Sequence, residues 1–483
     1  MNYHLIYPEI FLCGVALFVL VLDLFLAREQ KKILGWLCVA ELILTLFVIG
    51  ISYGTNSAGG ALSFYNTFST DMFSAFFKYA VTLGTILVIL SSMDFLNTHK
   101  SHHGEFYCLV LLSTAAIFFL ASAQDLILLY LALEFLSICS YVLAAFVRTD
   151  AKSSEAGLKY FLLGAVTSAV MLYGISFVYG LTGSTQLSAI AEVIRARGIA
   201  EDSILFFSSM LVLVGFGFKS ALVPFHMWCP DTYEGAPTAV TAYLACVAKL
   251  GGLVGIFRIF WVAFQPLQQD WSFMLGVISA FSMTIGNLIA IQQTNIKRLL
   301  AYSSISHAGF ILMGFASATA QNVGLQSTLV YITAYMFMNM GAFIAVMIVS
   351  SLMRSEEIED YAGLSQRAPG LALCLAVFML SLLGLPPLSG FIAKFYVFAA
   401  AVSGDMLWLA VVAMLNSVIS AYYYLGVVRV MYLVPAKDPA PLHAKESGLN
   451  IALFLAMTAT LLILPAAQFL SRATKLFSEM FHM

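Results

Sequence analysis

The stretch GFGFKSALVPFHMWCPDTYEGAPTAVTAYLACVAK (215–249) decides how this chain is built. It places Lys219 inside an apolar run, interrupts that run at Pro224, and places Lys249 inside a second apolar run. A charged side chain at the centre of a membrane helix costs about 2.5–3.5 kcal/mol on insertion scales, and proline removes a backbone donor. The stretch therefore predicts an interrupted membrane helix whose polar groups face protein or a wet cavity.

The composition places the rest of the chain in the membrane as well. Of the 483 residues, 61% are apolar and 10% are charged, whereas soluble domains carry about 25% charged residues. The apolar runs are long and continuous, as in membrane helices of about 20 residues and unlike barrel strands that alternate over about 10. We expect an all-α polytopic membrane protein. The net charge of −2 argues against a nucleic-acid partner.

Motifs for cofactors or metals are missing from the sequence. The seven cysteines are scattered without a C-x-x-C pair, which argues against an iron–sulfur or zinc site. Neither a P-loop nor a complete G-x-G-x-x-G occurs. The HKSHH cluster from His99 to His103 lies in an expected loop, and we do not interpret it as a metal site. We expect no cofactor and no metal in this chain.

Apolar runs between polar breaks predict about 14 spans. The first run lacks a basic start and contains Asp23, so we expect a retained span and not a signal peptide. The expected spans are 5–26, 33–53, 72–93, 106–123, 125–147, 157–182, 203–230, 238–262, 272–292, 299–317, 325–350, 370–399, 403–434 and 449–470.

Basic residues are unequally shared between the two sets of loops. Loops after even-numbered spans, with the C-terminal tail, contain only Arg195, Arg197, Arg472 and Lys475. By the positive-inside rule, the loops after odd-numbered spans face the cytoplasm and both termini face the outer side. The basic residues of the odd loops are Arg28, Lys31, Lys32, Lys100, Arg148, Lys152, Lys297, Arg298, Arg354, Arg367, Lys437 and Lys445.

Two runs are too long for one simple span, and each contains proline: 203–230 with Pro224, and 370–399 with Pro386 and Pro387. Each should be a broken helix. If spans 4–8 and 9–13 form two five-helix units, each break falls in the fourth helix of its unit, and the odd number of spans inverts the second unit. We predict an N-terminal three-helix segment (1–105), a first repeat (106–262), a second, inverted repeat (263–434) and a C-terminal helix with tail (435–483).

Four charged residues lie within the expected spans: Glu134, Lys219, Lys249 and Lys394. Snorkelling towards the interface is one alternative, and it fits Lys249 worst because apolar residues extend about two turns on either side. Static ion pairs are another, although three lysines against one glutamate are unbalanced. Burial disfavours the charged form of a lysine, so these groups can exchange protons near neutral pH. Glu134 would modulate Lys219, with Lys249 and Lys394 as relay stations.

Three further residues are secondary candidates for a proton path: Lys159, His226 and His307. Lys159 is a proton entrance or a snorkelling lysine, and His226 links Lys219 to Lys249 through water or is a loop histidine. His307 lies among serines that could hold water or join helices by hydrogen bonds. Other charges lie nearer span ends, and we expect no functional role for them: Asp23, Glu41, Lys78, Arg258 and Arg429.

These residues resemble the antiporter-like subunits of proton-pumping NADH–quinone oxidoreductase, respiratory complex I. The resemblance covers essentially the whole chain and rests on three motifs in order. They are GFGFKSALVPFHMWCPDTYEGAPT (215–238) followed by Lys249, QTNIKRLLAYSSISHAGF (293–310) and LPPLSGFIAKFY (385–396). The chain looks like the N-type branch of this family, with AYYYL at 421–425 and a matching length.

The resemblance implies a 14-helix membrane-arm subunit that translocates protons while electrons pass from NADH to quinone in partner subunits. Glu134 and Lys219 correspond to the family's ion pair, Lys249 to the central relay and Lys394 to the outer-side exchange residue, where the M-type relative would carry glutamate. Flavin, iron–sulfur clusters and quinone are then expected in partner subunits. M-type and K-type neighbours, the lipid bilayer and a bacterial inner membrane complete the expected setting.

Two other classes of function stay open on the sequence. A subunit of a multi-subunit cation/proton antiporter would use much the same local chemistry, so only its partners would distinguish it. A non-pumping scaffold, such as a subunit of a membrane-bound hydrogenase, would tolerate substitution of all four buried charges once assembly is verified.

Overall fold

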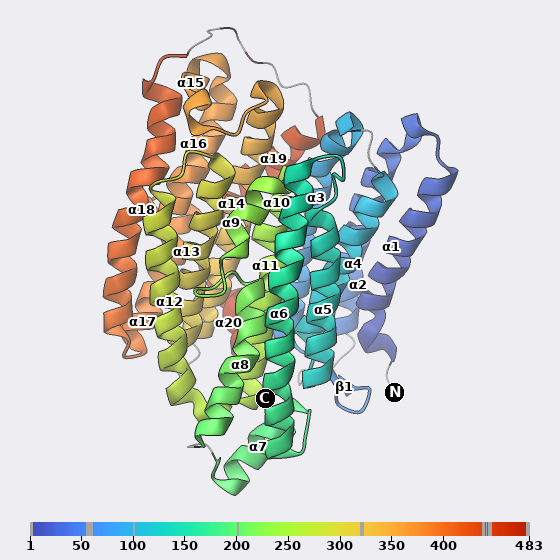
Figure 1. Ribbon diagram of the computed structural model, residues 1–483, viewed down its shortest axis with the longest axis vertical. Helices are drawn as coiled ribbons and strands as arrows, with labels where there is room; N and C mark the ends of the chain where they lie inside the picture. Colours follow the sequence, from blue (N-terminus) through green and yellow to red (C-terminus); the bar gives the residue numbers. More distant parts are fainter. Residues whose placement is uncertain are drawn as a thin grey trace.

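The computed structural model describes residues 3–54, 61–99, 102–199, 202–318, 323–436, 440, 442 and 447–479. It is a bundle of long helices that stand roughly side by side (Figure 1). One antiparallel hairpin, β1 (Ala61–Ser63) and β2 (Phe68–Thr70), joins the second and third helices. Lys100 of the HKSHH cluster, Lys437 and Lys445 lie outside the described residues.

Eleven helices within the described ranges are long and apolar enough to cross a membrane, and four further apolar helices are shorter. The expected class, an all-α polytopic membrane protein, is confirmed; the count of 14 spans stays a prediction. Ten of the eleven are α1 (Tyr7–Phe25), α2 (Lys32–Gly54), α3 (Met72–His99), α4 (His103–Ser122), α5 (Leu126–Ala144), α6 (Ala151–Thr182), α12 (Gln268–Ala290), α13 (Ile296–Ala316), α14 (Val323–Met353) and α18 (Leu407–Leu433).

Short polar side chains set where several of these helices begin. The Asp125 carboxylate accepts from the backbone N–H groups of Ile127 and Leu128 at the start of α5. Asp150 and Asn295 cap α6 and α13 in the same way. Each cap satisfies donors that have no partner within the helix. Apolar runs therefore set the helices, and capping residues set their ends.

Two helices are interrupted at the prolines. α8 (Ser203–Lys219) ends before Pro224, and α9 (Trp228–Gly235) begins after it. α16 (Pro369–Leu383) and α17 (Ser389–Ser403) flank Pro386 and Pro387. Freed backbone groups find partners inside the protein: Val223 N–H donates to Ser282 Oγ at 3.0 Å, and Gly390 N–H to Ser381 Oγ at 3.3 Å. The irregular backbone is thus enclosed by protein, as the absence of hydrogen-bonding water in lipid requires.

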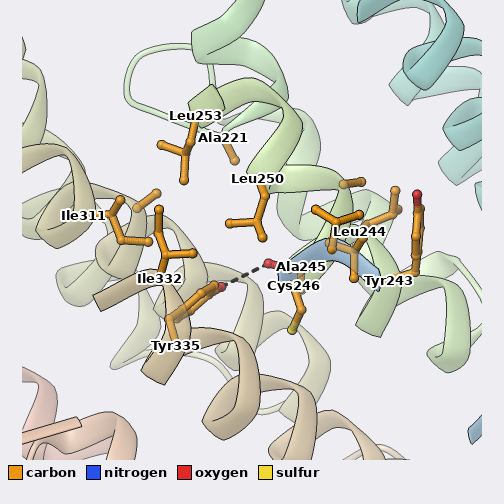
Figure 2. Close-up of a cluster of buried hydrophobic side chains, with 14 of the residues drawn as sticks. Ala221, Tyr243, Leu244, Ala245, Cys246, Leu250, Leu253, Ile311, Ile332 and Tyr335 are labelled. Atoms are coloured by element: carbon orange, nitrogen blue, oxygen red, sulfur yellow. Dashed lines mark hydrogen bonds between the residues drawn. The ribbon is translucent and has the colours of Figure 1, made fainter. Parts of the chain in front are cut away.

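The eleventh long helix, 238–263, carries Lys249 and is not uniform. α10 (Thr238–Tyr243) leads into a π turn (Leu244–Ala248), α11 (Lys249–Arg258) follows, and a second π turn (Ile259–Ala263) ends it. Tyr335 of α14 donates to the Ala245 carbonyl in the first π turn at 3.2 Å (Figure 2). Leu250 and Leu253 lie in the same apolar cluster, which shields the region around Lys249 (Figure 2). Such π turns occur frequently at functional sites.

The two chain ends lie towards the same end of the bundle (Figure 1). The hairpin strand β1 and α7 (Leu187–Arg197), both in loops expected on the outer side, lie at that end as well. α15 (Leu364–Arg367), in a loop expected in the cytoplasm, lies at the opposite end. The remaining helices are α19 (Ser447–Leu462) and α20 (Ala467–Glu479), which pack against α14 and α3.

Gly390 at the start of α17 gives a test of this packing. An added Cβ would overlap the Ser381 carbonyl oxygen of α16, whereas a Cβ at Gly426 of α18 meets nothing within 4 Å. Overpacking costs about 1–3 kcal/mol. We expect Gly390→Ala to lower the thermal unfolding midpoint of the purified protein and Gly426→Ala to leave it unchanged or raise it. Equal midpoints for the two variants would contradict the close approach of α16 and α17.

Candidate functional site

Three lysines within the bundle are enclosed by protein. Lys219 and Lys249 are each 1% exposed, and Lys394 is 4% exposed. None of them reaches a surface, so snorkelling does not describe how the chain accommodates them. Each ammonium must therefore find its hydrogen-bond partners inside the protein.

Lys219 is the last residue of α8, where the helix carbonyls favour a positive charge. Its Nζ donates to Ser140 Oγ of α5 and to the Tyr160 hydroxyl of α6, both at 2.9 Å. The Tyr160 ring stacks on Trp228 with a centroid distance of 4.1 Å, and Trp228 Nε1 donates to the Phe218 carbonyl at 2.9 Å. The interruption between α8 and α9 thus holds Tyr160 rigidly against the ammonium.

Glu134 lies on α5, six residues before Ser140, and is partly buried. Its carboxylate accepts from Ser168 Oγ at 2.6 Å, and Ser168 also shares a hydrogen bond of 3.2 Å with Tyr130. The ion pairs formed by the described residues do not include one between Glu134 and Lys219. Glu134 thus lies on α5, and Lys219 contacts α5 through Ser140. The two charged groups bond to different hydroxyl groups.

Lys249 begins α11, directly after the first π turn. Its Nζ donates to both the carbonyl and the Oγ of Ser304 on α13, each at 2.9 Å. Cys229 Sγ of α9 lies 4.0 Å from the same Ser304 Oγ. Ser304 therefore contacts both Lys249 and the helix that follows the first interruption, α9.

His307 lies one turn further along α13. Its Nδ1 is 2.7 Å from the Tyr331 hydroxyl of α14, and its Nε2 is 3.1 Å from the Tyr424 hydroxyl of α18. Tyr424 also shares a hydrogen bond with Ser303. The polar residues of this helix therefore join α13 to α14 and α18 around a buried histidine, which is one of the two alternatives that the sequence left open.

Lys394 of α17 is the third buried lysine, and we call Lys219, Lys249 and Lys394 the row of lysines. Its Nζ donates to the Leu383 carbonyl, at the end of α16, at 2.7 Å and to Ser417 Oγ at 2.8 Å. It also lies 4.9 Å from the centroid of the Phe310 ring, a cation–π distance. Ser304, His307 and Phe310 follow each other at intervals of three on one face of α13, so His307 lies between the contacts of Lys249 and Lys394.

The other two secondary candidates lie outside this row. His226 is half-buried in the interruption after α8, and no hydrogen bond joins it to Lys219 or Lys249 in the described part of the chain. Lys159 is 45% exposed and forms ion pairs of 2.9 Å with Glu155 and with Asp231. Lys159 therefore belongs to a surface network, which continues from Asp231 to Arg298.

A cavity of about 980 Å³ opens at the end of the bundle where the expected cytoplasmic loops gather. It reaches Pro237 and Thr238, at the start of the helix that carries Lys249. Lys297 lies beside it, buried, and donates to Glu356 at 3.0 Å and to the carbonyls of Glu234 and Ala236. The charged residues that line the cavity are Asp94, Asp150, Lys152, Glu234, Lys297, Arg354, Glu356 and Glu357.

Sequence reasoning missed the partners of the buried lysines. Ser140, Tyr160 and Ser417 are polar side chains in apolar runs, and that position was the available signal. It is a weak signal, because serines and tyrosines in spans often bond to their own helix, as Ser208 does to the Ile204 carbonyl. Only the fold shows which of them face an ammonium.

Comparison with known proteins follows the same motifs. A family model described as NADH:quinone oxidoreductase/Mrp antiporter, TM, matches residues 123–420. NADH-quinone oxidoreductase subunit N of Trichlorobacter lovleyi is 40% identical over 480 residues, covering 98% of this chain and 97% of the relative. F(420)H(2) dehydrogenase subunit N of Methanosarcina mazei is 40% identical over 441 residues, covering 89% of this chain and 88% of the relative.

Solved structures agree. A chain of respiratory complex I from Thermus thermophilus with bound aureothin has a TM-score of 0.79 and 30% identity, covering 96% of this chain and 98% of that one. A chain of the Mrp complex from Dietzia sp. DQ12-45-1b has a TM-score of 0.86 at 20% identity, covering 100% of this chain and 98% of that one. At that identity the second likeness concerns the fold alone.

The surface network around Asp231 predicts a pH dependence. Burial opposes ionisation of Asp231, but hydrogen bonds from Lys159 and Arg298 outweigh it and hold the pKa of the carboxyl below its usual range. A lowered pKa contributes stability above the unfolded value, about 3.9, and loses it as the pH falls through the folded value. Because Asp231 is 38% exposed, the contribution should not exceed about 1 kcal/mol.

We therefore expect Asp231→Asn to lower the thermal unfolding midpoint slightly at pH 7, with the difference from the parent shrinking as the pH falls below about 4 and vanishing below the folded pKa of Asp231. Glu155→Gln is the matched control, since Glu155 is more exposed and contacts only Lys159 among the ion pairs of the described ranges. A difference that does not shrink as the pH falls below about 4 would contradict the assigned cause.

Proposed function

We propose that this chain, which belongs to the NADH:quinone oxidoreductase/Mrp antiporter family as a subunit N of NADH-quinone oxidoreductase, moves protons through Glu134, Lys219, Lys249 and Lys394. The observation that carries the proposal is the kind of partner each lysine has. Within the described part of the chain, Lys219, Lys249 and Lys394 donate to hydroxyl and carbonyl oxygens and form no ion pair with a carboxylate. With no fixed carboxylate beside it, a buried lysine is stable with or without its proton.

Several other lysines of the chain have a carboxylate as their partner. Lys78, Lys159 and Lys297 each contact a carboxylate within 3.0 Å. A carboxylate stabilises the ammonium and opposes loss of the proton. The bundle therefore contains lysines held charged by anions and a separate row of three that are held by neutral oxygens, and only the second kind suits a relay.

The chain is a proton-translocating membrane-arm subunit of bacterial NADH–quinone oxidoreductase, a multi-pass membrane protein that works with the other subunits of that complex. The proposal adds that flavin, iron–sulfur clusters and quinone lie in partner subunits. Electron transfer there would then drive proton movement in this chain through changes of charge in the neighbouring subunits. It also places M-type and K-type subunits as neighbours, the complex in the inner membrane and both termini on the outer side, in agreement with the basic residues of the odd loops.

In the first proposed step of proton transfer, Lys219 changes between two sets of partners: the hydroxyls of Ser140 and Tyr160, or the carboxylate of Glu134. In this structure the ammonium is bound by Ser140 and Tyr160 while Glu134 is bound by Ser168. A charge change in a neighbouring subunit that brings Glu134 and Lys219 together stabilises the ammonium, and their separation releases the proton towards Lys249. Water in the interruption beside His226 would carry that transfer.

The second step runs along α13. Lys249 is bound to Ser304 and Lys394 lies against Phe310, six residues further on, with His307 between them. Six residues of helix rise about 9 Å. The hydroxyls of Tyr331 and Tyr424 contact both nitrogens of His307. These groups supply hydrogen-bond partners between the two lysines, and Lys394 then exchanges with the outer side.

The domain division belongs to the same proposal: two inverted five-helix repeats, 106–262 and 263–434, between a three-helix segment (1–105) and a C-terminal helix with tail (435–483). Its support is the matched position of the interruptions. Lys219 is the last residue of α8, and Lys394 donates to Leu383, the last residue of α16. Each proposed repeat thus has a buried lysine that either ends the helix before the proline break, as Lys219 does, or donates to its last residue, as Lys394 does.

Substitution of Lys219 tests the path. We expect Lys219→Ala, in an assembled enzyme, to reduce proton translocation per NADH oxidised to less than about a tenth, the scale on which a positioned proton-transfer group acts. Acidification of inverted membrane vesicles, measured beside NADH oxidation, gives the ratio. Lys32→Ala, an exposed lysine, is the matched control. Full pumping by an assembled Lys219→Ala enzyme would remove Lys219 from the path.

Tyr160→Phe tests the two sets of partners. It removes one of the two acceptors of Lys219 while keeping the ring stacked on Trp228, and loss of a partner of a buried charged group costs about 1–3 kcal/mol. We expect Lys219 to shift towards Glu134 and pumping to fall several-fold. Tyr141→Phe, a ring that packs on Tyr160, should leave pumping unchanged.

The double variant Tyr160→Phe with Glu134→Gln gives the cycle for this test. If the two partners compete for Lys219, the double variant should lose much less than the product of the two single losses. Independent losses that simply multiply would show that Tyr160 does not act through the position of Lys219.

A further inference from the structure

A second group of buried charges lies apart from the row of lysines, in the N-terminal three helices. Lys78 of α3 and Glu9 of α1 form an ion pair of 2.6 Å, and both side chains are 0% exposed. We expected no functional role for Lys78 because it lies near a span end. The side chain is nevertheless enclosed, by Glu9 of α1 and by rings from α2, β2 and α4.

The surroundings of this pair are unusually poor in hydrogen bonds. Apart from each other, neither Glu9 oxygen nor Lys78 Nζ has a hydrogen-bond partner in the described part of the chain. The ammonium is surrounded by the rings of Phe68, Tyr53 and Phe118, with centroids at 5.4, 5.9 and 5.9 Å. A buried ion pair repays its desolvation only when further hydrogen bonds satisfy it. In the described part of the chain, the pair is therefore a buried ion pair satisfied by its mutual contact and by aromatic rings.

Polar groups lie between the pair and the helix of Lys249. The Tyr53 ring, whose centroid is 5.9 Å from Lys78 Nζ, carries a hydroxyl that shares a hydrogen bond of 2.5 Å with Ser74 Oγ. Ser74 Oγ donates to the backbone carbonyl of Asp71 at 2.8 Å, and the Ser74 backbone N–H donates to the Asp71 carboxylate at 2.7 Å. Asp71 forms an ion pair of 2.6 Å with Arg258, the last residue of α11.

The series of polar groups from Glu9 to Arg258 has two distinct ends. Asp71 directly precedes α3, and Ser74 and Lys78 lie on one face of that helix. Of the four charged side chains, Asp71 is the most exposed, at 13%. Arg258 also donates to the Ala121 carbonyl, so its position is rigid. Lys249 and Arg258 are the first and last residues of α11. The cluster thus has one opening to water and one connection to the relay.

We propose that Glu9 and Lys78 form a further proton-binding site, filled from and emptied to the outer side through Ser74 and Asp71, and coupled to Lys249 through Arg258. A proton arriving past Asp71 binds the Glu9 carboxylate, which becomes a neutral acid beside the Lys78 ammonium. Release returns the same proton along the same groups and restores the ion pair. The proposal rests on the proton-translocating function given above and adds a site outside the four residues of that path.

The test uses the intact NADH–quinone oxidoreductase in membrane vesicles and a pair of double variants. Glu9→Gln with Lys78→Met keeps the shapes but cannot bind a proton, whereas the exchange Glu9→Lys with Lys78→Glu keeps an ion pair. We expect the neutral pair to assemble, oxidise NADH at a rate within about twofold, and translocate at least about threefold fewer protons per NADH. The exchanged pair should retain more than half of the pumping.

A control pair and a relay variant separate the possible failures. Asp23→Asn with Lys31→Met neutralises another ion pair of α1, at 2.7 Å, and should leave pumping unchanged. Lys249→Met, measured in parallel, reports on the main path. If Lys249→Met stops pumping while the neutral pair of residues 9 and 78 pumps normally, the main path stands and the proposal of a further site is overturned.

A second measurement does not depend on assembly of the double variant. The infrared difference spectrum between resting and turning-over parent enzyme should contain a protonated-carboxyl band that Glu9→Gln removes and Glu9→Asp shifts. A spectrum that Glu9→Gln leaves unchanged shows that Glu9 keeps one protonation state, and the pair is then a structural link between α1 and α3.

Discussion

Ammonium groups enclosed in a bundle of membrane helices and bound only by neutral oxygens are the constraint on which the rest of this structure depends. Such a group needs oxygen acceptors at its own depth, and a regular helix offers few, since its carbonyls are already bonded. The chain supplies them by ending helices early. Lys219 ends α8, and Lys394 reaches the carbonyl of Leu383 where α16 ends. Proline at each interruption and a charged side chain beside it are thus two parts of one solution.

The same constraint explains why the helix of Lys249 is irregular. A π turn directly precedes Lys249, and Tyr335 satisfies the Ala245 carbonyl within that turn. The ammonium takes both oxygens of Ser304. The first π turn and the break at Pro224 are thus each matched by a hydrogen bond with another helix, which is the condition for irregular backbone at membrane depth. Rigid enclosure by neighbours also keeps lipid and bulk water from the lysines.

Much of the fold could be predicted from the sequence because continuous apolar runs indicate membrane helices. The run expected at 238–262 is the helix 238–263, and the expected interruptions near Pro224 and Pro386 fall between observed helices. The cross-helix partners did not follow. Tyr160 looks like any tyrosine in an apolar run, and its role depends on Trp228, 68 positions away. The enclosure of Lys78 depends on Glu9 of α1 and on rings from α2, β2 and α4, which a count from the span end ignores.

Electrostatics alone can couple the stations of this row. Two unit charges about 9 Å apart, the rise of six residues along α13, interact by about 2 kcal/mol at an effective dielectric constant of about 20. A difference of 1.36 kcal/mol changes a proton-binding equilibrium tenfold. In the proposed path, two charges that far apart would shift each other's proton-binding equilibrium by about tenfold without any movement of the helices between them. The oxygen partners that the described residues give to these lysines are neutral, so no carboxylate bonded to the ammonium would cancel that coupling.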